Sequence, residues 1–485
     1  MRGRFAPYVV GTGLLTLAGV TALFAAYAAL AREPVSGFLA AAAVGALAGW
    51  PLRRVGAPSA EPTRREALLA VLVSWAVVPA LAGLPYVLTA GFTPLNALFE
   101  SMSGFTTTGA TVLTDFADFP STLFMWRALS QWVGGIGILV IFIAVFPQLA
   151  IAGRQLFFAE APGPTEERLT PRLRHTATAI VIVYAGLTLA CAVAYAVFGM
   201  SPFDAVAHAF TTLAAGGFSP NARSFQGYAS PALDWVGVVF MLFAGANFAL
   251  LYRGLVGRPR EILRDPEFRA YVSIALLASL ALTALLLGTY GVADAARHGF
   301  FQVFSIMTTT GYASADFAAW PQRAQAVLVV MMFIGGSAGS AGGGIKVVRW
   351  LIIARNTARE VRRALHPRAV LPVRLGRRVV PEDVLRAVAA FITLYVGLFA
   401  FSTVALVMLG SDFVTAFTAS IACLGNIGPG LARVGPMVDF GGLHPASRLL
   451  LIFDMYAGRL EVVTVFVVVT VGWWRLPRRR RGARS

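Results

Sequence analysis

The chain has 485 residues, of which 57% are hydrophobic and only 13% are charged, and its formal net charge is +17. Soluble domains carry about 25% charged residues, so this composition excludes an ordinary soluble protein and indicates a helical membrane protein. A transmembrane β-barrel is excluded because the short alternating segments that it needs are missing.

Ten long apolar runs follow one another along the chain. They cover residues 8–31, 36–51, 67–90, 122–151, 176–199, 234–256, 270–290, 324–352, 385–410 and 447–474. The first run ends in an AxA-like sequence, but it is longer than the ~7–15 residues of a signal-peptide core. We therefore interpret it as an uncleaved membrane span.

The basic residues predict how these spans are oriented. Nearly all of them are arginine, with Lys346 the only lysine, and they gather in residues 52–66, 152–175, 253–269, 349–386 and the C-terminal tail. Positive charge between spans stays on the cytoplasmic side, so both termini are predicted to be cytoplasmic. This pattern fits a lipid bilayer rather than nucleic acid. Anionic lipid headgroups or a cytosolic partner could equally bind the arginine-rich connection and the tail.

Four connections on the opposite side of the membrane are too long and too apolar for aqueous loops. They are residues 93–111 (TPLNALFESMSGFTTTGAT), 201–219 (SPFDAVAHAFTTLAAGGFS), 294–314 (DAARHGFFQVFSIMTTTGYAS) and 412–430 (DFVTAFTASIACLGNIGPG). Each opens with about a dozen mainly apolar residues, too few to span, which is typical of a re-entrant helix. Asn96, Asp204 and Asp294 lie near the helix starts, where we expect N-caps.

One glycine in each connection brings the four into register: Gly109, Gly217, Gly311 and Gly428. Their spacings are 217 − 109 = 108, 311 − 217 = 94 and 428 − 311 = 117, which indicates an internal repeat. We therefore predict an all-α polytopic membrane protein with about ten spans and four re-entrant pore helices. It would consist of two N-terminal helices (1–66) and four repeats (67–160, 161–262, 263–366 and 367–485).

The Thr/Gly-rich ends of these connections suggest an ion pathway. Non-helical backbone at membrane depth is tolerated only where it is buried in protein or lines water. Four copies can surround one axis, and a ring of backbone carbonyls can replace the hydration shell of an ion. The short helices direct their partly negative C-terminal ends at such a ring, which favours a cation.

A glycine-rich run from Gly335 to Gly344 interrupts the apolar segment 324–352. It cannot remain a stable helix, because each glycine costs about 1 kcal/mol relative to alanine. It is not a phosphate-binding loop, since Ile345 and Val347 flank Lys346 where that motif needs other residues. We expect a loop that crosses the pore and changes conformation.

Charged residues inside the last apolar run are a second candidate for function, because charge within a membrane is costly. Arg459 is expected in the pore, where it would repel cations. A local structural pair of Arg459 with Glu461 or Asp454 is the alternative. Arg127 and Asp454 are further intramembrane candidates, although each fits an interface position equally well.

The sequence contains no motif typical of a catalytic site or a zinc site. Cys191 and Cys423 lack the spacing of a zinc or disulfide motif. His208 and His298 have no evident catalytic partner, and we expect no enzyme. A secondary transporter coupled to H⁺ or Na⁺ is an alternative function, although it would need carboxylates or histidines at the helix breaks, and the breaks lack them.

Several motifs together resemble the Trk/Ktr/HKT superfamily of potassium transporters, and most closely its TrkH family of bacterial Trk-system membrane subunits. They are TTTGAT (106–111), AAGGFSP (214–220), TTTGYAS (308–314), CLGNIGPGL (423–431), GGSAGSAGGGIKVVR (335–349) and GRLE (458–461). The resemblance covers nearly the whole chain and implies four membrane–pore–membrane repeats around one pore. The second loop departs from the family, which more often has an asparagine there, so a hydrogen bond behind that loop is in doubt.

The resemblance also implies which residues act. The potassium-binding filter would comprise Thr107, Thr108, Gly109, Ala215, Gly216, Gly217, Thr309, Thr310, Gly311, Asn426, Ile427 and Gly428. The gating loop would comprise Gly335, Gly336, Ser337, Gly339, Gly342, Gly343, Gly344 and Lys346, with Arg459 as a barrier in the pore. Glycine at all four filter positions favours potassium over sodium, and a K⁺/Na⁺ non-selective member is the alternative.

The resemblance finally implies a setting for this activity. It is potassium uptake across the bacterial inner membrane by a homodimer. A cytosolic TrkA-like ring that binds nucleotides would control the gate. The transported potassium ion would be bound by the chain, and no organic cofactor is expected.

Overall fold

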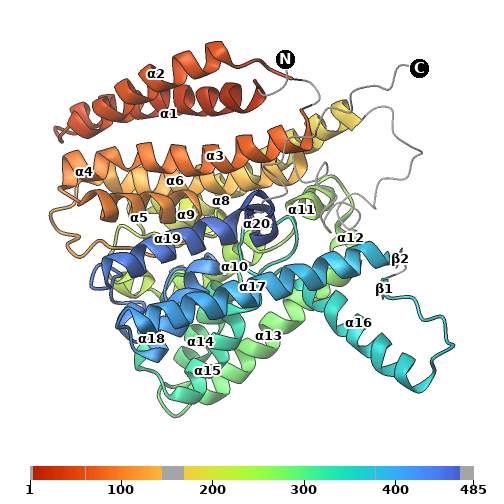
Figure 1. Cartoon of the computed structure of the whole chain (residues 1–485). Coiled ribbons are helices and arrows are strands. Elements are labelled where there is room, and N and C mark those ends of the chain that lie inside the picture. The colour runs from red at the N-terminus through yellow and green to blue at the C-terminus, as the bar shows by residue number, and fades with distance from the viewer. Residues whose placement is uncertain (1–3, 60–61, 145–168, 377, 470–485) are drawn as a thin grey trace, which may run out of the picture.

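The computed structural model describes residues 4–59, 62–144, 169–376 and 378–469, and within them it is almost entirely helical (Figure 1). The β-structure of these residues is a short antiparallel ladder of β1 (Arg374–Leu375) and β2 (Arg378–Val379). The fold class predicted from composition and apolar runs is therefore confirmed as all-α.

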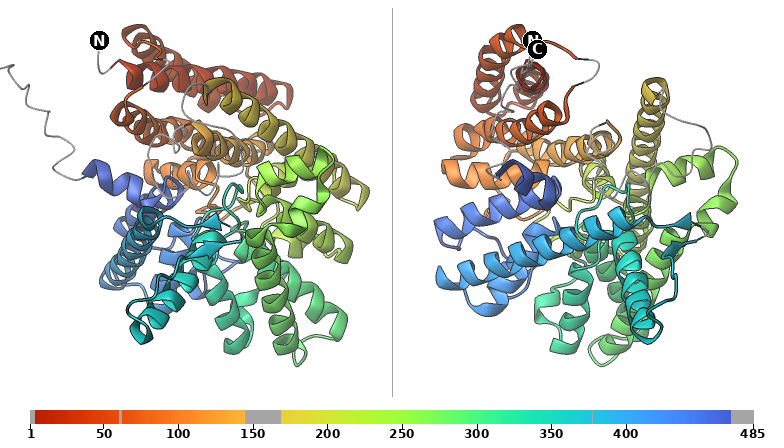
Figure 2. Two further views of the ribbon diagram at one scale, coloured as in Figure 1. Left: turned by 90° about the vertical axis from the view of Figure 1, so that its right-hand side faces the viewer. Right: turned by 45° about the vertical axis from the view of Figure 1, so that its right-hand side comes forward.

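Two N-terminal helices lie side by side at one edge of the molecule, outside the repeats (Figures 1 and 2). They are α1 (Phe5–Leu30) and α2 (Ser36–Val55). A Cβ on Gly11 would lie within 3.0 Å of backbone atoms of Gly49 and Arg53. Small residues therefore allow the two backbones to approach, as is common between membrane helices.

The rest of the chain follows the order of a repeated unit: a long helix, a short helix, an extended loop and a second long helix. The first two units contain α3 (Arg64–Ala82), α4 (Leu84–Ala90), α5 (Pro94–Phe105) and α6 (Ser121–Ala144), then α8 (Leu169–Val197), α9 (Pro202–Leu213), η2 (Ser224–Tyr228), α10 (Pro231–Ala244), α11 (Phe248–Leu255) and α12 (Pro259–Arg264). The last two contain α13 (Pro266–Leu286), α14 (Val292–Met307), η3 (Phe317–Ala319), α15 (Gln322–Met332) and α16 (Val347–Leu365), then α17 (Glu382–Met408), α18 (Phe413–Leu424), η4 (Ala432–Val434), α19 (Pro445–Arg459) and α20 (Val462–Val469).

The N-caps of the short helices differ from our expectation. Thr93, Ser201 and Asp412 cap α5, α9 and α18, and each side chain accepts a hydrogen bond from the backbone N–H three residues later. Asn96 and Asp204 supply that N–H and lie one turn inside the helix. The expectation was wrong because a cap must precede the helix, and proline directly after the cap fixes where α5 and α9 begin.

Asp294 also lies inside its helix, because α14 begins after Gly291. It is the third helical residue of α14, where a carboxylate still interacts favourably with the partly positive helix N-terminus. Our N-cap expectation was therefore wrong here as well.

Several helices are long and apolar enough to cross a membrane. Among the described residues there are five, namely 5–30, 65–90, 177–197, 266–286 and 382–408, and α10 with α11 forms a sixth that is bent by 102°. Large side chains on their outer faces are exposed, such as Leu189 at 67% and Leu277 at 69%. Such exposure is expected where lipid replaces water.

Within the described residues, the second long helix is broken in three of the four repeats. The break predicted in segment 324–352 is confirmed, since α15 ends at Met332 and α16 begins at Val347. The sequence did not predict the break between α10 and α11 or the one between α19 and α20. The break between α10 and α11 brings backbone groups against residues 335–346, as described below.

Candidate functional site

The four short helices end in the same way. In each, the second residue after the helix adopts a left-handed conformation: Thr107 (φ 52°), Ala215 (φ 53°), Thr309 (φ 62°) and Asn426 (φ 54°). The next residue donates its backbone N–H to a carbonyl five residues earlier, as Thr108 does to Ser103 at 2.9 Å. This is the Schellman arrangement, usually made with glycine. Its repetition supports the register that the sequence predicted.

Each helix end leads into a short loop that finishes at one of the four register glycines. We call these ring loops, and they comprise residues 106–109, 214–217, 308–311 and 425–428. All four glycines have positive φ, between 76° and 103°. A residue with a Cβ adopts these values only at a cost, so glycine is required by the backbone itself.

The four ring loops close into a circle. A Cβ on Gly109 would overlap the carbonyl oxygen of Gly216, which belongs to the second loop. A Cβ on Gly217 would likewise overlap the carbonyl oxygen of Thr310 in the third loop, and one on Gly311 would overlap that of Ile427 in the fourth. A Cβ on Gly428 would lie 2.7 Å from the carbonyl oxygen of Thr108, back in the first loop. The carbonyl involved is always that of the residue before the glycine. The loops therefore surround a single axis, and a side chain at any of these glycines would disturb its neighbour.

Side chains from other repeats hold the ring loops from behind. Gln131 of α6 donates to the carbonyl oxygen of Gly216 at 2.7 Å and accepts from Phe218 N at 3.1 Å. A Cβ on Gly216 would overlap the side chain of Gln131. The second loop, whose hydrogen bonding the sequence left in doubt, is thus fixed by a glutamine from the first repeat, for which Gly216 makes room.

Similar support reaches the other loops. Asn426 Nδ2 donates to Thr108 Oγ1 at 3.0 Å and to Met455 O at 2.9 Å, and so joins the fourth loop to the first. Tyr312, which follows the third loop, places its hydroxyl 3.1 Å from Thr212 Oγ1 in the second repeat. The ring is therefore a connected polar network and not four independent turns.

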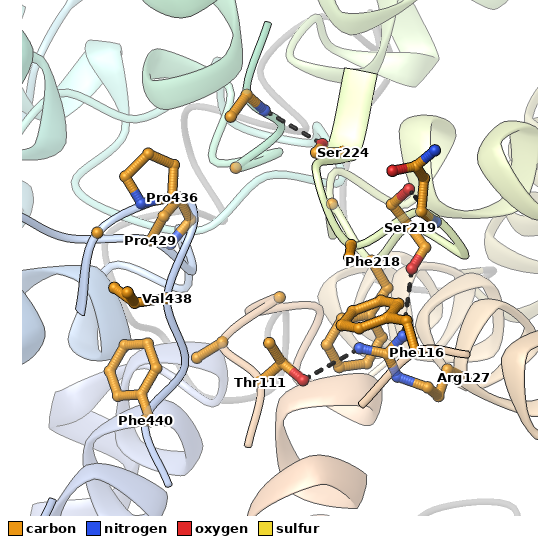
Figure 3. Close-up of a pocket in the computed structure, with 18 residues that line it drawn as sticks. Thr111, Phe116, Arg127, Phe218, Ser219, Ser224, Pro429, Pro436, Val438 and Phe440 are labelled. Carbon is orange, nitrogen blue, oxygen red and sulfur yellow. Dashed lines mark hydrogen bonds between the residues drawn. The ribbon is translucent and has the colours of Figure 1, made fainter. Parts of the chain in front are cut away.

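A pocket of about 70 Å³ lies on the side of the ring away from the helix ends (Figure 3). Its lining includes Gly109, Gly217 and Gly311 together with Pro429, so it opens directly onto the ring. Arg127 of α6 is also in its wall and donates to Thr111 and Ser219 (Figure 3).

Residues 335–346, which we call the glycine segment, lie directly against the ring. Gly343 N donates to Thr309 Oγ1 at 2.7 Å. Ser337 N donates to Gly245 O at 2.8 Å, and Phe248 N donates to Gly339 O at 3.1 Å. The break between α10 and α11 therefore supplies the backbone partners that a non-helical segment needs inside a membrane protein.

Two basic side chains reach the same segment. Lys346 Nζ donates to Gly342 O and to Ser340 Oγ. Arg459 Nη1 donates to Ala341 O at 2.9 Å, and its Nη2 donates to Gly134 O at 3.2 Å. Both side chains are buried.

The local pair that was the alternative for Arg459 does not occur among the described residues. Glu461 instead pairs with Arg349 at the start of α16, at 2.6 Å. Asp454 accepts from Ser402 at 2.9 Å. No carboxylate in the described part of the chain pairs with Arg459, so its guanidinium places a positive charge beside the glycine segment.

Comparison with known proteins covers nearly the whole chain. The family model for TrkH, described as a cation transport protein, matches residues 33–472. The Trk system potassium uptake protein TrkH of Salmonella typhimurium is 38% identical over 475 residues, covering 96% of this chain and 97% of the relative. The TrkH of Vibrio parahaemolyticus is 38% identical over 477 residues, covering 95% of this chain and 97% of the relative. The chain belongs to the TrkH family of cation transport proteins.

A solved structure of the TrkH family supports the same fold. The crystal structure of the potassium transporter TrkH from Vibrio parahaemolyticus superposes with a TM-score of 0.89 at 35% identity, covering 98% of this chain and 100% of that one. The resemblance found from the motifs is confirmed. As a member of a transporter family, the chain is a membrane transport protein and not an enzyme.

Several residues that shape the site of this TrkH-family chain were not predicted from its sequence. Gln131, Glu100 and Glu267 were not singled out, and Arg127 was placed only as an intramembrane or interface residue. A polar residue in an apolar helix is a general signal for function. For Arg127, Gln131 and Glu267 it does not say which loop the residue contacts, because Ser219, Gly216 and Ala338 are 71 to 92 residues away in sequence.

Proposed function

We propose that this TrkH-family chain mediates potassium uptake across the cell membrane, and that the four ring loops are its selectivity filter. The observation that carries the proposal is the closed circle of glycine and carbonyl contacts. Its relatives are named as potassium uptake proteins. Backbone carbonyls arranged around an axis can replace the water that a K⁺ ion leaves behind.

The residues that would bind the ion are those of the ring. They are Thr107, Thr108 and Gly109, then Ala215, Gly216 and Gly217, then Thr309, Thr310 and Gly311, and finally Asn426, Ile427 and Gly428. The carbonyl oxygens of Thr108, Gly216, Thr310 and Ile427 each lie against the glycine of the preceding loop. This close approach supports a shared coordination site at that level of the ring.

The glycine segment is proposed as the gate below the filter. Its non-helical backbone is held by hydrogen bonds that could be exchanged, including the one from Gly343 to Thr309 in the third ring loop. Arg459 and Lys346 place positive charge beside it, which would oppose the passage of a cation. Opening would require the segment and the guanidinium of Arg459 to move apart.

Control by a cytosolic partner completes the proposal. The relatives belong to a named Trk system, and α16 continues directly from the glycine segment and extends away from the helical body (Figure 1). A nucleotide-binding TrkA-like ring could pull on this helix and open the gate. We further propose a homodimer in the bacterial inner membrane with cytoplasmic termini, in agreement with the arginine-rich connections.

The proposal is tested by tracer uptake into liposomes that hold the purified chain, with K⁺ and Na⁺ compared. We expect K⁺ uptake that exceeds Na⁺ uptake, and loss of this preference in Gly311→Ser. Gly288→Ser is the matched control, because Gly288 has no atom within 4 Å of an added Cβ. Equal K⁺ and Na⁺ uptake by the unchanged chain would establish a non-selective transporter instead. No cation uptake, even with residues 335–344 deleted, would refute the proposal.

A further inference from the structure

We propose that the ion pair of Glu100 and Arg127 is a positioning unit that sets ion selectivity, because it fixes the outer sides of the first two ring loops and joins them. This inference rests on the proposed filter function. We call the one to three residues after each ring glycine the outer limb, since they lead from the ring toward the pocket of Figure 3.

The position of Glu100 recurs in the repeats. Counting back from the ring glycines gives 109 − 100 = 9, 217 − 208 = 9 and 311 − 302 = 9, which correspond to Glu100, His208 and Gln302. Each side chain is buried. Nine residues before the glycine is therefore one structural position, on the face of the short helix that looks toward its own outer limb.

All three side chains bond the outer limb of their own repeat. Glu100 accepts from Val112 N at 2.9 Å. His208 Nε2 lies 3.0 Å from Ser219 Oγ, and Gln302 Nε2 donates to Tyr312 O at 2.9 Å. In the fourth repeat this position is Ala419, and the neighbouring Thr418 accepts from Leu431 N at 2.9 Å instead. Every outer limb is thus fixed by its short helix.

Arg127 extends this support across two repeats. Its Nε donates to Glu100 at 2.8 Å, its Nη2 to Thr111 Oγ1 at 3.2 Å, and its Nη1 to Ser219 O at 3.3 Å. The guanidinium also lies over the Phe218 ring, 4.1 Å from its centroid. One side chain therefore ties the outer limb of the first loop to that of the second, and the bonds fix their separation.

The charge of Arg127 requires its partner. The side chain of Arg127 is 2% exposed and that of Glu100 is 0% exposed, so neither charge is well solvated. Arg127 lines the pocket at the outer entrance of the ring. An unpaired guanidinium there would repel an approaching cation. Glu100 removes that repulsion and also orients the guanidinium toward both limbs.

Glu100 is thus assigned two roles, neutralising the charge of Arg127 and holding the outer limbs in place through it. They can be separated by measuring the KM for K⁺ and the K⁺/Na⁺ preference in reconstituted liposomes. Glu100→Gln leaves the arginine charge and should raise KM about tenfold, the size that Coulomb's law gives for one charge ~10 Å away at an effective dielectric constant of about 20. Glu100→Gln combined with Arg127→Gln removes both charges. It should return KM toward the unchanged chain but lower the K⁺/Na⁺ preference, because the ties to Thr111 and Ser219 are lost.

Arg127→Lys is a second, milder variant that we expect to fold, because it keeps the charge pair with Glu100. It loses only the guanidinium geometry that bonds both outer limbs. Arg127→Lys should leave the KM for K⁺ unchanged and lower the K⁺/Na⁺ preference. Arg448→Gln is the matched control, because Arg448 also bonds α5, through Asn96, but does not contact an outer limb. If the unchanged chain prefers K⁺ and all the Glu100 and Arg127 variants behave like Arg448→Gln, the pair is only structural and this inference is wrong. Failure of the unchanged chain to transport K⁺ would instead remove the proposed function.

Discussion

The guanidinium of Arg459 donates a hydrogen bond to the carbonyl oxygen of Ala341, and the two atoms are 2.9 Å apart. The bond joins α19 of the fourth repeat to the glycine segment of the third. The other terminal nitrogen of Arg459 reaches Gly134 of the first repeat. A single buried side chain therefore connects three repeats next to the ring.

Replacement of Arg459 by alanine should raise basal K⁺ uptake in the absence of any cytosolic partner. The change removes both a positive charge near the proposed ion path and the bond to Ala341, so we expect an increase of about tenfold. The measurement is ⁸⁶Rb⁺ or K⁺ tracer uptake into liposomes. Arg448→Ala, on the same helix but away from the glycine segment, should leave uptake unchanged. Unaltered uptake in Arg459→Ala would assign the arginine a structural role.

Glu267 joins the glycine segment to the first turn of α16, which follows it. Its Oε1 accepts from Ala338 N at 2.7 Å and from Val348 N, the second residue of α16, at 3.1 Å. Glu267→Ala should also raise basal uptake, because hydrogen bonds to a charged group contribute about 1.5–3 kcal/mol each. Uptake assays would show an increase of about tenfold or more.

A nearby glutamate serves as the control for Glu267. Glu261→Ala removes a carboxylate from the exposed helix α12, where ion pairs contribute little. Its uptake should equal that of the unchanged chain. An equal effect of both substitutions would show that the response comes from net charge on this side of the membrane and not from the bonds to Ala338 and Val348.

Much of the fold could be predicted because it depends on local patterns. Apolar length identifies spans, and four glycines at similar spacing identify the repeats. The left-handed residue two positions before each glycine was not predicted, since three of the four, Thr107, Ala215 and Thr309, are not residues that favour that conformation. It follows from the helix end, which each repeat closes with the same pair of backbone bonds.

The contacts between repeats could not be predicted in the same way. Nothing in the sequence near Gly245 indicates that the helix breaks there to bond Ser337, because the reason lies in a segment 92 residues later. The same holds for Gln131, whose partner Gly216 belongs to the next repeat. Repeated motifs predict the ring, while its supports depend on how the repeats pack against one another.

Gln131 provides a test of those supports. Gln131→Ala removes the bonds to Gly216 and Phe218 and leaves a cavity behind the second ring loop. The carbonyl of Gly216 would then be less fixed, so the K⁺/Na⁺ preference should fall several-fold while K⁺ uptake continues. Gln325→Ala is a suitable control, since Gln325 bonds only loop carbonyls near η3. A preserved preference in Gln131→Ala would mean that the ring itself fixes this carbonyl.

Glu33, in the connection between α1 and α2, gives a prediction for pH dependence. Its carboxylate accepts from the backbone and hydroxyl groups of Ser121 and Thr122, and so caps the start of α6. Burial by itself would raise the pKa of this carboxyl, but the hydrogen bonds from Thr122 and Ser121 lower it below its ordinary value of 4.5. The folded state therefore favours the ionised form.

A lowered folded-state pKa means that the stabilisation by Glu33 is fully present above the ordinary pKa and is lost as the pH falls through the folded-state value. Glu33→Gln should lower the melting temperature of the purified chain by ~2 °C at pH 7, since loss of a helix cap costs about 1 kcal/mol. The difference should disappear when the pH is brought well below 4.5. Glu360→Gln, on the exposed part of α16, should show no such convergence. A difference for Glu33→Gln that persists at low pH would show that shape, and not the carboxylate charge, makes this cap.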